Sequence, residues 1–469
     1  MSMLNSPSML INGRLVRHEQ MMDVINPANE RVICQVPFAT STDAIQAIAA
    51  AKAAYPQWRN VSLEVRKNVL LNIADIIEQN SQELRQLITL EQGKPLAGSD
   101  MELMMSATVL RYFASLKLAP EVIRNDDSQR VELHRRPLGI VAAIIPWNFP
   151  VLMAVYKLAP ALLAGNTLVI KPSPTTPLAT LRLGELLQSV VPAGVINVLA
   201  DRGDIGPLLS QSTDVAKISF TGSTQTGRQV MASSAHNLKR LTLELGGNDA
   251  AIVLDDVNVE QVAEQIFDMA FINSGQVCMS IKRIYVQEGV YDAMCAALAK
   301  RVADSVTGDG MDPATQFGPV QNRKQFDDIR NVLSLVPQYG RILAGGKIRT
   351  PGFFIEPTLV CDTDETSPIA NEEIFGPVRS IMKFNTIDEA VSRANNSQYG
   401  LGGSVWSSDV EKAAAIAGRL ECGISWVNQH FAMAPDVPFG GVKQSGMGVE
   451  FSEHGLDEYT SIQSLVVAK

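Results

Sequence analysis

From residue 139 onward, short apolar runs alternate with segments of helix length, and this alternation constrains the fold more than any other feature. Strands that alternate with helices form a parallel sheet with helices on both faces. We therefore predict an α/β fold, in which ligands bind beyond the carboxyl ends of the strands. The first block of expected strands comprises Ile140–Ile145, Thr167–Lys171, Ile196–Leu199, Lys217–Phe220 and Leu241–Leu245.

A second alternating block follows the first and predicts a second sheet. Its strands are expected near Ala251–Leu254, Arg283–Val286, Pro357–Val360, Arg379–Phe384 and Gly402–Trp406, and its helices near 259–273, 289–304 and 386–396. A chain of 469 residues is too long for one compact core. We expect two tandem Rossmann-like open-sheet domains, with the active site in the cleft between them.

The segments before and after these blocks have a different character. A short strand region precedes helices, of which the first is expected to be capped at Ser41-Thr42-Asp43 and the third to end at Gly93. Glu121–Glu132 is polar and charged, which favours a protruding hairpin or arm. The final strand-like run, Ile462–Val467, could pair outside its own domain.

Composition excludes several classes of partner. The net charge of −9 and the absence of a basic stripe argue against nucleic-acid binding. The apolar stretch Leu138–Ile170 is interrupted by prolines, Lys157 and Asn166, so we expect no membrane span. The N-terminus does not resemble a secretory signal.

The cysteines Cys34, Cys278, Cys295, Cys361 and Cys422 are odd in number and widely spaced, which indicates free thiols in the cytoplasm and no structural zinc site.

Three polar residues occupy positions suited to chemistry. Cys278 lies in a Gly-containing loop, and Glu244 ends an apolar run just before Gly-Gly. Asn148 comes directly after an expected strand and lies between Pro146 and Pro150. They could serve as nucleophile, base and oxyanion donor. Taken one at a time, each also has an ordinary interpretation: a buried thiol, a surface carboxylate at a strand end and a turn-forming asparagine.

The segment Phe220–Gly227 follows a strand and opens a helix with small residues. Free backbone N–H groups at a helix N-terminus suit a pyrophosphate. The segment is not a GxGxxG fingerprint, so alone it is a weak signal. Lys171, at the end of another strand, could reach a ribose or phosphate.

Together these segments resemble the aldehyde dehydrogenase superfamily, from Asn26 to Gly446. The spacing of Glu244 and Cys278 (278 − 244 = 34 positions) is also similar to the family's. The family's motifs occur in its order: PWNFP at 146–150, KPS at 171–173, FTGS at 220–223, LELGGN at 243–248, GQVC at 275–278 and EEIFGP at 372–377.

The resemblance implies a role for each matching residue. Cys278 would attack an aldehyde, and the Asn148 amide with the Cys278 N–H would hold the oxyanion. Hydride transfer to a nicotinamide would leave a thioester, which water activated by Glu244 would hydrolyse to the free acid. Lys157 and Glu450 match a proton relay behind that base, with a plain buried ion pair as the alternative.

The resemblance also implies NAD or NADP as cofactor. Glu373 and Phe375 match residues that hold the nicotinamide ribose and ring, and Trp147, Lys171, Ser173, Gly222 and Ser223 match the adenosine and pyrophosphate side. Many NAD-preferring members carry a glutamate where this chain has Pro174. Loss of that carboxylate removes repulsion against a 2′-phosphate, so we expect NADP to be tolerated.

The family's organisation divides the chain into three parts. Residues 1–118 and 138–246 would form the NAD(P)-binding domain, and residues 247–445 the catalytic domain. Residues 119–137 and 446–469 would form an oligomerisation arm and C-terminal tail, in a homodimer or homotetramer.

The expected substrate is a medium-chain aliphatic or aromatic aldehyde. No arginine marks a carboxylate clamp, which disfavours a semialdehyde such as succinate semialdehyde. A second alternative is a cysteine hydrolase without a redox cofactor. It would need a histidine in a partner motif, and the sequence has none. A third alternative, an inactive binding protein, would have no need of Cys278, Glu244 and Asn148. The candidates for the entrance tunnel are Tyr112, Phe113, Phe149, Met153, Tyr156, Met279, Phe431 and Met433.

Overall fold

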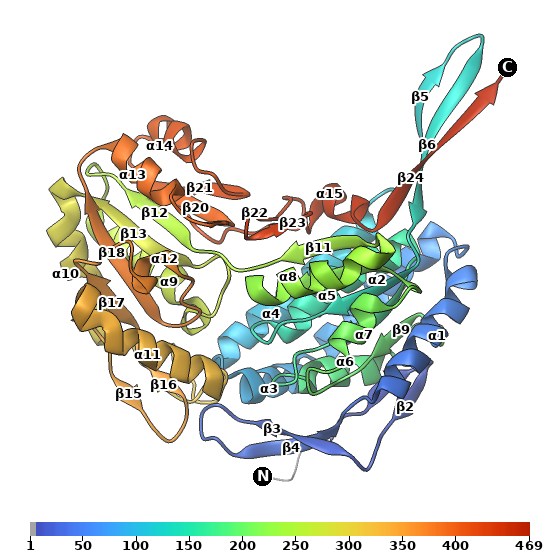
Figure 1. The fold of residues 1–469 in the computed structure, drawn as a ribbon, viewed down its shortest axis with the longest axis horizontal. Helices are drawn as coiled ribbons and strands as arrows, with labels where there is room; N and C mark the ends of the chain where they lie inside the picture. Colours follow the sequence, from blue (N-terminus) through green and yellow to red (C-terminus); the bar gives the residue numbers. More distant parts are fainter. Residues whose placement is uncertain (1–5) are drawn as a thin grey trace.

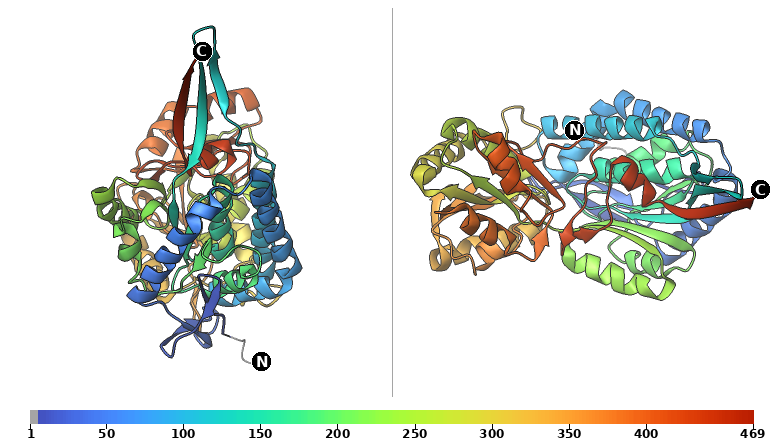
Figure 2. Two further views of the ribbon diagram at one scale, coloured as in Figure 1. Left: turned by 90° about the vertical axis from the view of Figure 1, so that its right-hand side faces the viewer. Right: turned by 90° about the horizontal axis from the view of Figure 1, so that it is seen from above.

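The computed structural model describes residues 6–469 and contains both predicted sheets, which lie side by side (Figures 1 and 2). The first sheet has eight strands in the order β2-β1-β9-β8-β7-β10-β11-β23. Its central strands run parallel, as predicted, while β1 and β23 add antiparallel edges. The strands are β1 (Met9–Ile11), β2 (Arg14–Val16), β7 (Ile140–Ile144), β8 (Thr167–Lys171), β9 (Ile196–Val198), β10 (Val215–Thr221), β11 (Arg240–Glu244) and β23 (Gly446–Met447).

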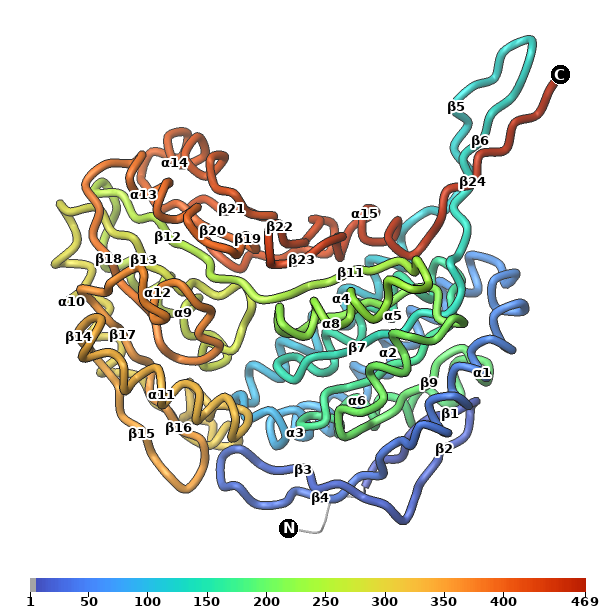
Figure 3. The backbone as a smooth tube through the Cα atoms, viewed as in Figure 1, coloured from blue at the N-terminus to red at the C-terminus, as the bar shows by residue number. Residues whose placement is uncertain are grey.

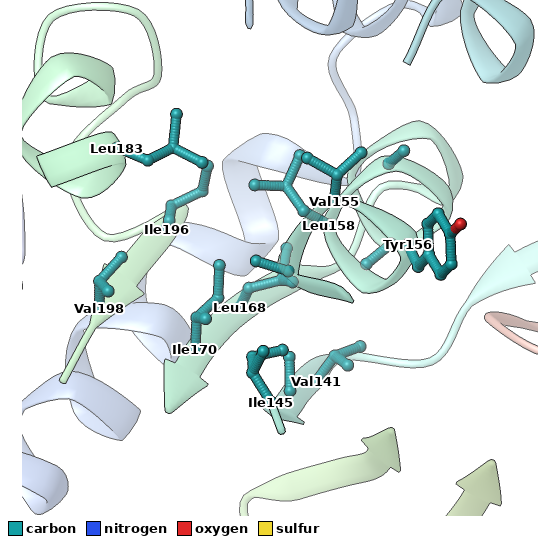
Figure 4. Packing of buried hydrophobic residues seen from close by; sticks show 14 of the residues in the cluster. Val141, Ile145, Val155, Tyr156, Leu158, Leu168, Ile170, Leu183, Ile196 and Val198 are labelled. Carbon is teal, nitrogen blue, oxygen red and sulfur yellow. The ribbon is translucent and has the colours of Figure 1, made fainter. Parts of the chain in front are cut away.

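Helices cover this first sheet. The central one, α5 (Pro150–Ala164), is buried along almost its whole length. Figure 4 shows Val155 and Leu158 of α5 packed against Leu168 and Ile170 of β8. Pro150 at the first turn pre-sets the helical φ, so α5 begins directly after the strand–helix connection that carries Asn148. The other helices are α6 (Leu178–Leu187), α7 (Gly206–Gln211), α8 (Thr224–Ser234) and the 3-10 turn η1 (Ala235–Asn237).

The second sheet has seven strands in the order β14-β17-β18-β13-β12-β20-β21, all parallel except β14. The predicted strands are all present. They are β12 (Asp249–Val253), β13 (Ile281–Gln287), β17 (Thr358–Cys361), β18 (Val378–Phe384) and β20 (Gly402–Trp406), joined by the unforeseen β14 (Arg341–Ala344) and β21 (Ile424–Val427).

The helices of the second unit were only partly predicted. Those expected from the sequence are α9 (Val259–Phe271), α10 (Glu288–Asp304) and α13 (Ile387–Asn395). Three helices were not predicted: α11 (Arg323–Tyr339) and the short α12 (Pro368–Asn371) and α14 (Val410–Ala417). In α11 the buried residues Phe326, Ile329, Leu333 and Val336 do recur at helical spacing, which is a signal that could have found it. Short strand pairs connect these elements: β15 (Ile348–Arg349) with β16 (Phe354–Ile355), and β19 (Tyr399–Gly400) with β22 (Val442–Lys443).

The N-terminal helices pack beside the first sheet. Gly93 has φ 97° and ends α3, as predicted, but the cap of α1 is Thr40 rather than Ser41. Thr40 accepts from the Asp43 N–H while the Asp43 carboxylate accepts from the Thr40 N–H, which makes a capping box. The elements are the hairpin β3 (Met21–Ile25)–β4 (Val32–Pro37) and the helices α1 (Ser41–Trp58), α2 (Leu63–Gln79), α3 (Ser81–Gln92) and α4 (Leu96–Ser115).

A three-stranded sheet projects away from both units as an arm (Figure 3). β5 (Glu121–Asn125) and β6 (Gln129–Pro137) form the predicted hairpin, and the C-terminal β24 (Thr460–Ala468) pairs with β6 along its full length. The preceding helix, α15 (Ser452–Asp457), leads into β24. Among residues 6–469, no helix is both long and apolar enough to cross a membrane.

The connection between the two sheets is short. β11 ends at Glu244, and β12 begins at Asp249 in the other sheet. The Gly-Gly turn predicted after Glu244 therefore lies where the chain passes from one unit to the other. This crossing brings the carboxyl ends of β7, β10 and β11 of the first sheet to one cavity with the loops before β13 and β18, at the amino ends of strands in the second sheet. The expectation that ligands bind beyond the carboxyl ends of the strands therefore holds for the first sheet and is wrong for the second.

Candidate active site

A cavity of about 620 Å³ lies between the two units. Loops that follow β7, β10 and β11 of the first sheet line it, together with the loops before β13 and β18 of the second. Residues singled out from the sequence that line the cavity are Trp147, Asn148, Gly222, Ser223, Cys278, Glu373 and Phe375.

Cys278 sits on a loop that turns sharply after α9. Asn273, Ser274 and Gly275 have φ values of 52°, 54° and 72°, and such consecutive left-handed residues reverse the chain within the turn η2 (Ile272–Gly275). The Ser274 hydroxyl donates to the Gly318 carbonyl at 2.7 Å, which fixes the turn. The turn leaves Cys278 half-buried on the cavity wall.

The Cys278 thiol is held in its protonated form by its surroundings. Burial raises the pKa of the thiol to about 12, and the carboxylates of Glu373, Glu244 and Asp249 act in the same direction, against the opposing charge of Lys282. A thiol is the resting species at neutral pH. Nucleophilic attack therefore requires that a base or a change in the local charges remove the proton.

Asn148 lies beside the nucleophile loop. Its side-chain Nδ2 donates to the Gln276 carbonyl at 3.0 Å, close to Cys278 in the chain. Its own carbonyl accepts from the Lys94 ammonium at 2.8 Å and from the Asn273 amide at 3.2 Å. The bond to Gln276 thus orients the Asn148 side-chain amide, and the two bonds to the backbone carbonyl hold the loop that carries it, so the amide has a fixed position, as an oxyanion donor requires.

The ion pair that anchors the Asn148 loop was not predicted from the sequence. Lys94 and Glu102 form a buried ion pair of 2.6 Å. The Glu102 carboxylate also accepts from the N–H groups of Val151 at 2.9 Å and Leu152 at 3.2 Å, where it satisfies free donors at the start of α5. No local sequence signal distinguishes Glu102 within its helix, because the N–H groups that it binds at Val151 and Leu152 lie 49 and 50 positions away.

Glu244, at the end of β11, is buried but does not line the cavity. Neither of its carboxylate oxygens has a hydrogen-bond partner among the described residues. Burial raises the pKa of Glu244 well above its usual range, Glu450 raises it further and Lys157 opposes both. A buried carboxyl with a raised pKa and free oxygens has the properties of a general base for water.

Lys157 and Glu450 meet behind Glu244. They form an ion pair of 2.6 Å, and Lys157 Nζ also donates to the Thr221 hydroxyl at 2.7 Å. Both side chains are buried and neither lines the cavity. The structure thus contains the buried ion pair that the sequence analysis held as the alternative, and its charges act on the Glu244 carboxyl.

One end of the cavity has features of a nucleotide site. Gly222 and Ser223 precede α8, whose first residues Thr224 and Gln225 also line the wall. Trp147 and Phe375 meet edge to face, with ring centroids 5.2 Å apart.

Two predicted cofactor residues do not line the cavity. Lys171 ends β8 and forms a 2.7 Å ion pair with the buried Asp201. The Ser173 hydroxyl is 3.2 Å from that of Thr175. Neither is among the cavity-lining residues, so their part in binding stays a prediction.

The other end of the cavity is apolar. Of the candidates for the entrance tunnel, Phe149, Met153, Tyr156, Met279 and Phe431 line it, whereas Tyr112, Phe113 and Met433 do not. Met101 and Met105, one turn apart on α4, were missed because nothing local to α4 links it to the nucleophile loop.

Known proteins are similar to this chain over nearly its whole length. A sequence profile of the aldehyde dehydrogenase family matches residues 15–465. Phenylacetaldehyde dehydrogenase of Pseudomonas fluorescens is 38% identical, with 98% of this chain and 95% of that protein covered. Betaine aldehyde dehydrogenase of Bacillus subtilis (strain 168) is 36% identical, with 98% and 96% covered.

Solved structures agree with these sequence relatives. Betaine aldehyde dehydrogenase of Staphylococcus aureus, solved in complex with NAD+, has a TM-score of 0.95 at 36% identity, with 98% of this chain and 95% of that chain covered. Sequence and fold therefore point to the same conclusion: the chain belongs to the aldehyde dehydrogenase family.

Proposed function

We propose that this protein oxidises an apolar aldehyde to its carboxylic acid through a thioester on Cys278, which water activated by Glu244 hydrolyses. As a member of its family the protein is an NAD(P)-dependent aldehyde dehydrogenase. The observation that carries the proposed mechanism is that a single cavity has Cys278 and Asn148 on its wall together with the loops at Gly222 and Glu373.

The first step is attack of the deprotonated Cys278 sulfur on the aldehyde carbon. A C–S bond forms and the carbonyl π electrons move to oxygen, which the Asn148 amide and the Cys278 N–H stabilise. When bound, the nicotinamide accepts the hydride that the carbon then loses. Glu244 takes a proton from water, the resulting hydroxide adds to the thioester carbon, and the Cys278 thiolate leaves.

The residues at the polar end of the cavity fit a dinucleotide. The N-terminus of α8 offers backbone N–H groups, and the Ser223 hydroxyl caps that helix through the Thr226 N–H at 3.2 Å. The loop requires glycine at position 222, because a Cβ there would lie 2.6 Å from the Phe220 ring. Glu373, with a carboxylate in the wall, suits ribose hydroxyls, and Phe375 suits the nicotinamide ring. Trp147, Lys171 and Ser173 are assigned to the adenosine side.

We expect the kcat/KM values with NAD and NADP to lie within about a hundredfold of each other. That ratio corresponds to a difference of about 3 kcal/mol in transition-state stabilisation. Pro174 brings no negative charge to the adenosine side. The cavity beside Pro174 is lined by Asp23, Arg323 and Lys324, and the two cations are paired with Glu30 and Asp328. The expectation therefore depends on the missing carboxylate at position 174. Steady-state kinetics with both cofactors measure the ratio. Pro174→Glu should lower kcat/KM for NADP selectively, and a wild-type preference for NAD beyond a hundredfold would contradict the assignment.

A panel of aldehydes tests the reaction and the substrate class together. The methionine and aromatic side chains at the apolar end favour hexanal, benzaldehyde and phenylacetaldehyde over succinate semialdehyde and betaine aldehyde. Appearance of reduced cofactor separates oxidation from the cysteine-hydrolase alternative. The apolar assignment is wrong if succinate semialdehyde has the highest kcat/KM.

We further propose a division of the chain in which residues 1–118 and 138–246 bind the cofactor and residues 247–445 carry the nucleophile. In this division the arm joins subunits into an oligomer. The arm (119–137 and 446–469) exposes Val122, Ile123, Ile462, Leu465 and Val466. Light scattering should find a dimer or tetramer, and deletion of residues 460–469 should shift it towards monomer. A wild-type monomer at micromolar concentration would exclude this assembly.

A further inference from the structure

A buried lysine lies directly behind the nucleophile. Lys282 is 4% exposed and follows Cys278 at the start of β13. Its ammonium donates to the Val277 carbonyl at 2.9 Å and to the Cys278 carbonyl, and it lies 3.3 Å from Glu373 Oε1. The neighbouring Arg283 turns the other way and donates to the carbonyls of Asn248 and Ala394.

Glu373 is the link from Lys282 to the opposite loop. Besides Lys282, its carboxylate accepts from the Gly247 N–H at 3.0 Å. The loop that carries it, 372–377, is also tied to the nucleophile loop by Arg379, which donates to the carbonyls of Gly275 at 3.0 Å and Gly376 at 2.7 Å. Arg379 thus joins the two loops through their backbones, whereas Lys282 joins Cys278 itself to the Glu373 side chain.

We propose that Lys282 is a positioning residue for the reaction proposed above: it orients the Cys278 peptide group and holds the Glu373 carboxylate in the cavity wall. The Val277 carbonyl and the Cys278 N–H belong to one planar peptide unit. Fixing that carbonyl therefore fixes the direction of the N–H assigned to the oxyanion. The same ammonium sets the position of the side chain assigned to the cofactor ribose.

The charge of Lys282 also acts on the thiol. The titratable groups that face Cys278 are Lys282, Glu373, Glu244, Asp249 and Tyr156. Lys282 is the cation among them, and it opposes the rise in the Cys278 pKa that burial and the carboxylates cause. Removal of this charge should leave a less reactive thiol, whereas a residue that only fills space would have no such effect.

The test replaces Lys282 with the uncharged methionine of similar length. If the methionine variant does not fold, Lys282→Gln, which is polar but uncharged, is used in its place. Lys239→Met is the matched control, since Lys239 donates to the Ser212 carbonyl at 2.7 Å and does not line the cavity. Unfolding temperature checks the fold, and iodoacetamide alkylation of the Cys278 peptide is followed by mass spectrometry against pH, without cofactor or aldehyde.

At neutral pH, alkylation of Cys278 should slow about tenfold in the Lys282 variants, the effect of one unit in the thiol pKa. With aldehyde present, kcat of the Lys282 variants should fall and their KM for the cofactor should rise. Lys239→Met should match wild type in alkylation rate, kcat and KM. Wild-type alkylation rates and kcat in a folded Lys282 variant would overturn the proposal. If wild type oxidises no aldehyde but the alkylation difference holds, the proposed function fails and the positioning of Cys278 stands.

Discussion

Replacing Cys278 with alanine is expected to lower kcat for aldehyde oxidation by at least about 10⁴-fold, because no other group can form the thioester. The described thiols other than Cys278 do not line the cavity, so none is placed to substitute for it. The measurement is the rate of cofactor reduction at saturating aldehyde, with binding of the cofactor checked separately by fluorescence.

A second cysteine serves as the matched control. Cys34 is half-buried on β4, and its pKa is raised to about 11, mainly by burial. It does not line the cavity, and Cys34→Ser should retain the wild-type rate. Retention of more than about one hundredth of the wild-type kcat by Cys278→Ala would rule out Cys278 as the nucleophile.

Glu244→Gln is expected to separate the two halves of the reaction. The variant should release a rapid burst of reduced cofactor, because hydride transfer precedes hydrolysis. Its steady-state rate should then fall by about 10² to 10⁴-fold, the usual contribution of a general base. Rapid-mixing absorbance resolves the burst from the slow phase.

The pH dependence of hydrolysis provides an independent check of Glu244. A base acts only when deprotonated, and burial raises the pKa of this carboxyl. The wild-type hydrolysis rate should therefore rise with pH through that raised pKa, and the glutamine variant should lose the dependence. Glu91→Gln removes another fully buried carboxyl, whose pKa is raised to about 8, and should match wild type. An unchanged steady-state rate in Glu244→Gln would show that another group activates water.

The strands and the main catalytic candidates could be predicted because their signals are local. The run Thr167–Lys171 is the strand β8 itself, and the polar segment at 121–132 is the predicted hairpin. Cys278 and Asn148, predicted from motifs, line one cavity. Short-range pattern suffices where a segment's own residues determine its structure.

The supporting contacts could not be predicted because they join distant segments. Lys94 reaches the Asn148 carbonyl across 54 positions, and Arg379 reaches Gly275 across 104. Nothing in the residues around Lys282 shows which way its side chain faces, because its contacts with Val277 and Glu373 exist only once β13 is in place. Tertiary packing alone determines which buried charges meet the nucleophile loop.

The thioester on Cys278 can be observed directly. Glu244→Gln protein is mixed with cofactor and aldehyde, quenched in acid, digested and analysed by mass spectrometry. We predict a mass increase equal to the aldehyde less two hydrogens, confined to the peptide that contains Cys278. Reduced cofactor without this adduct, or an adduct on another residue, would contradict the mechanism.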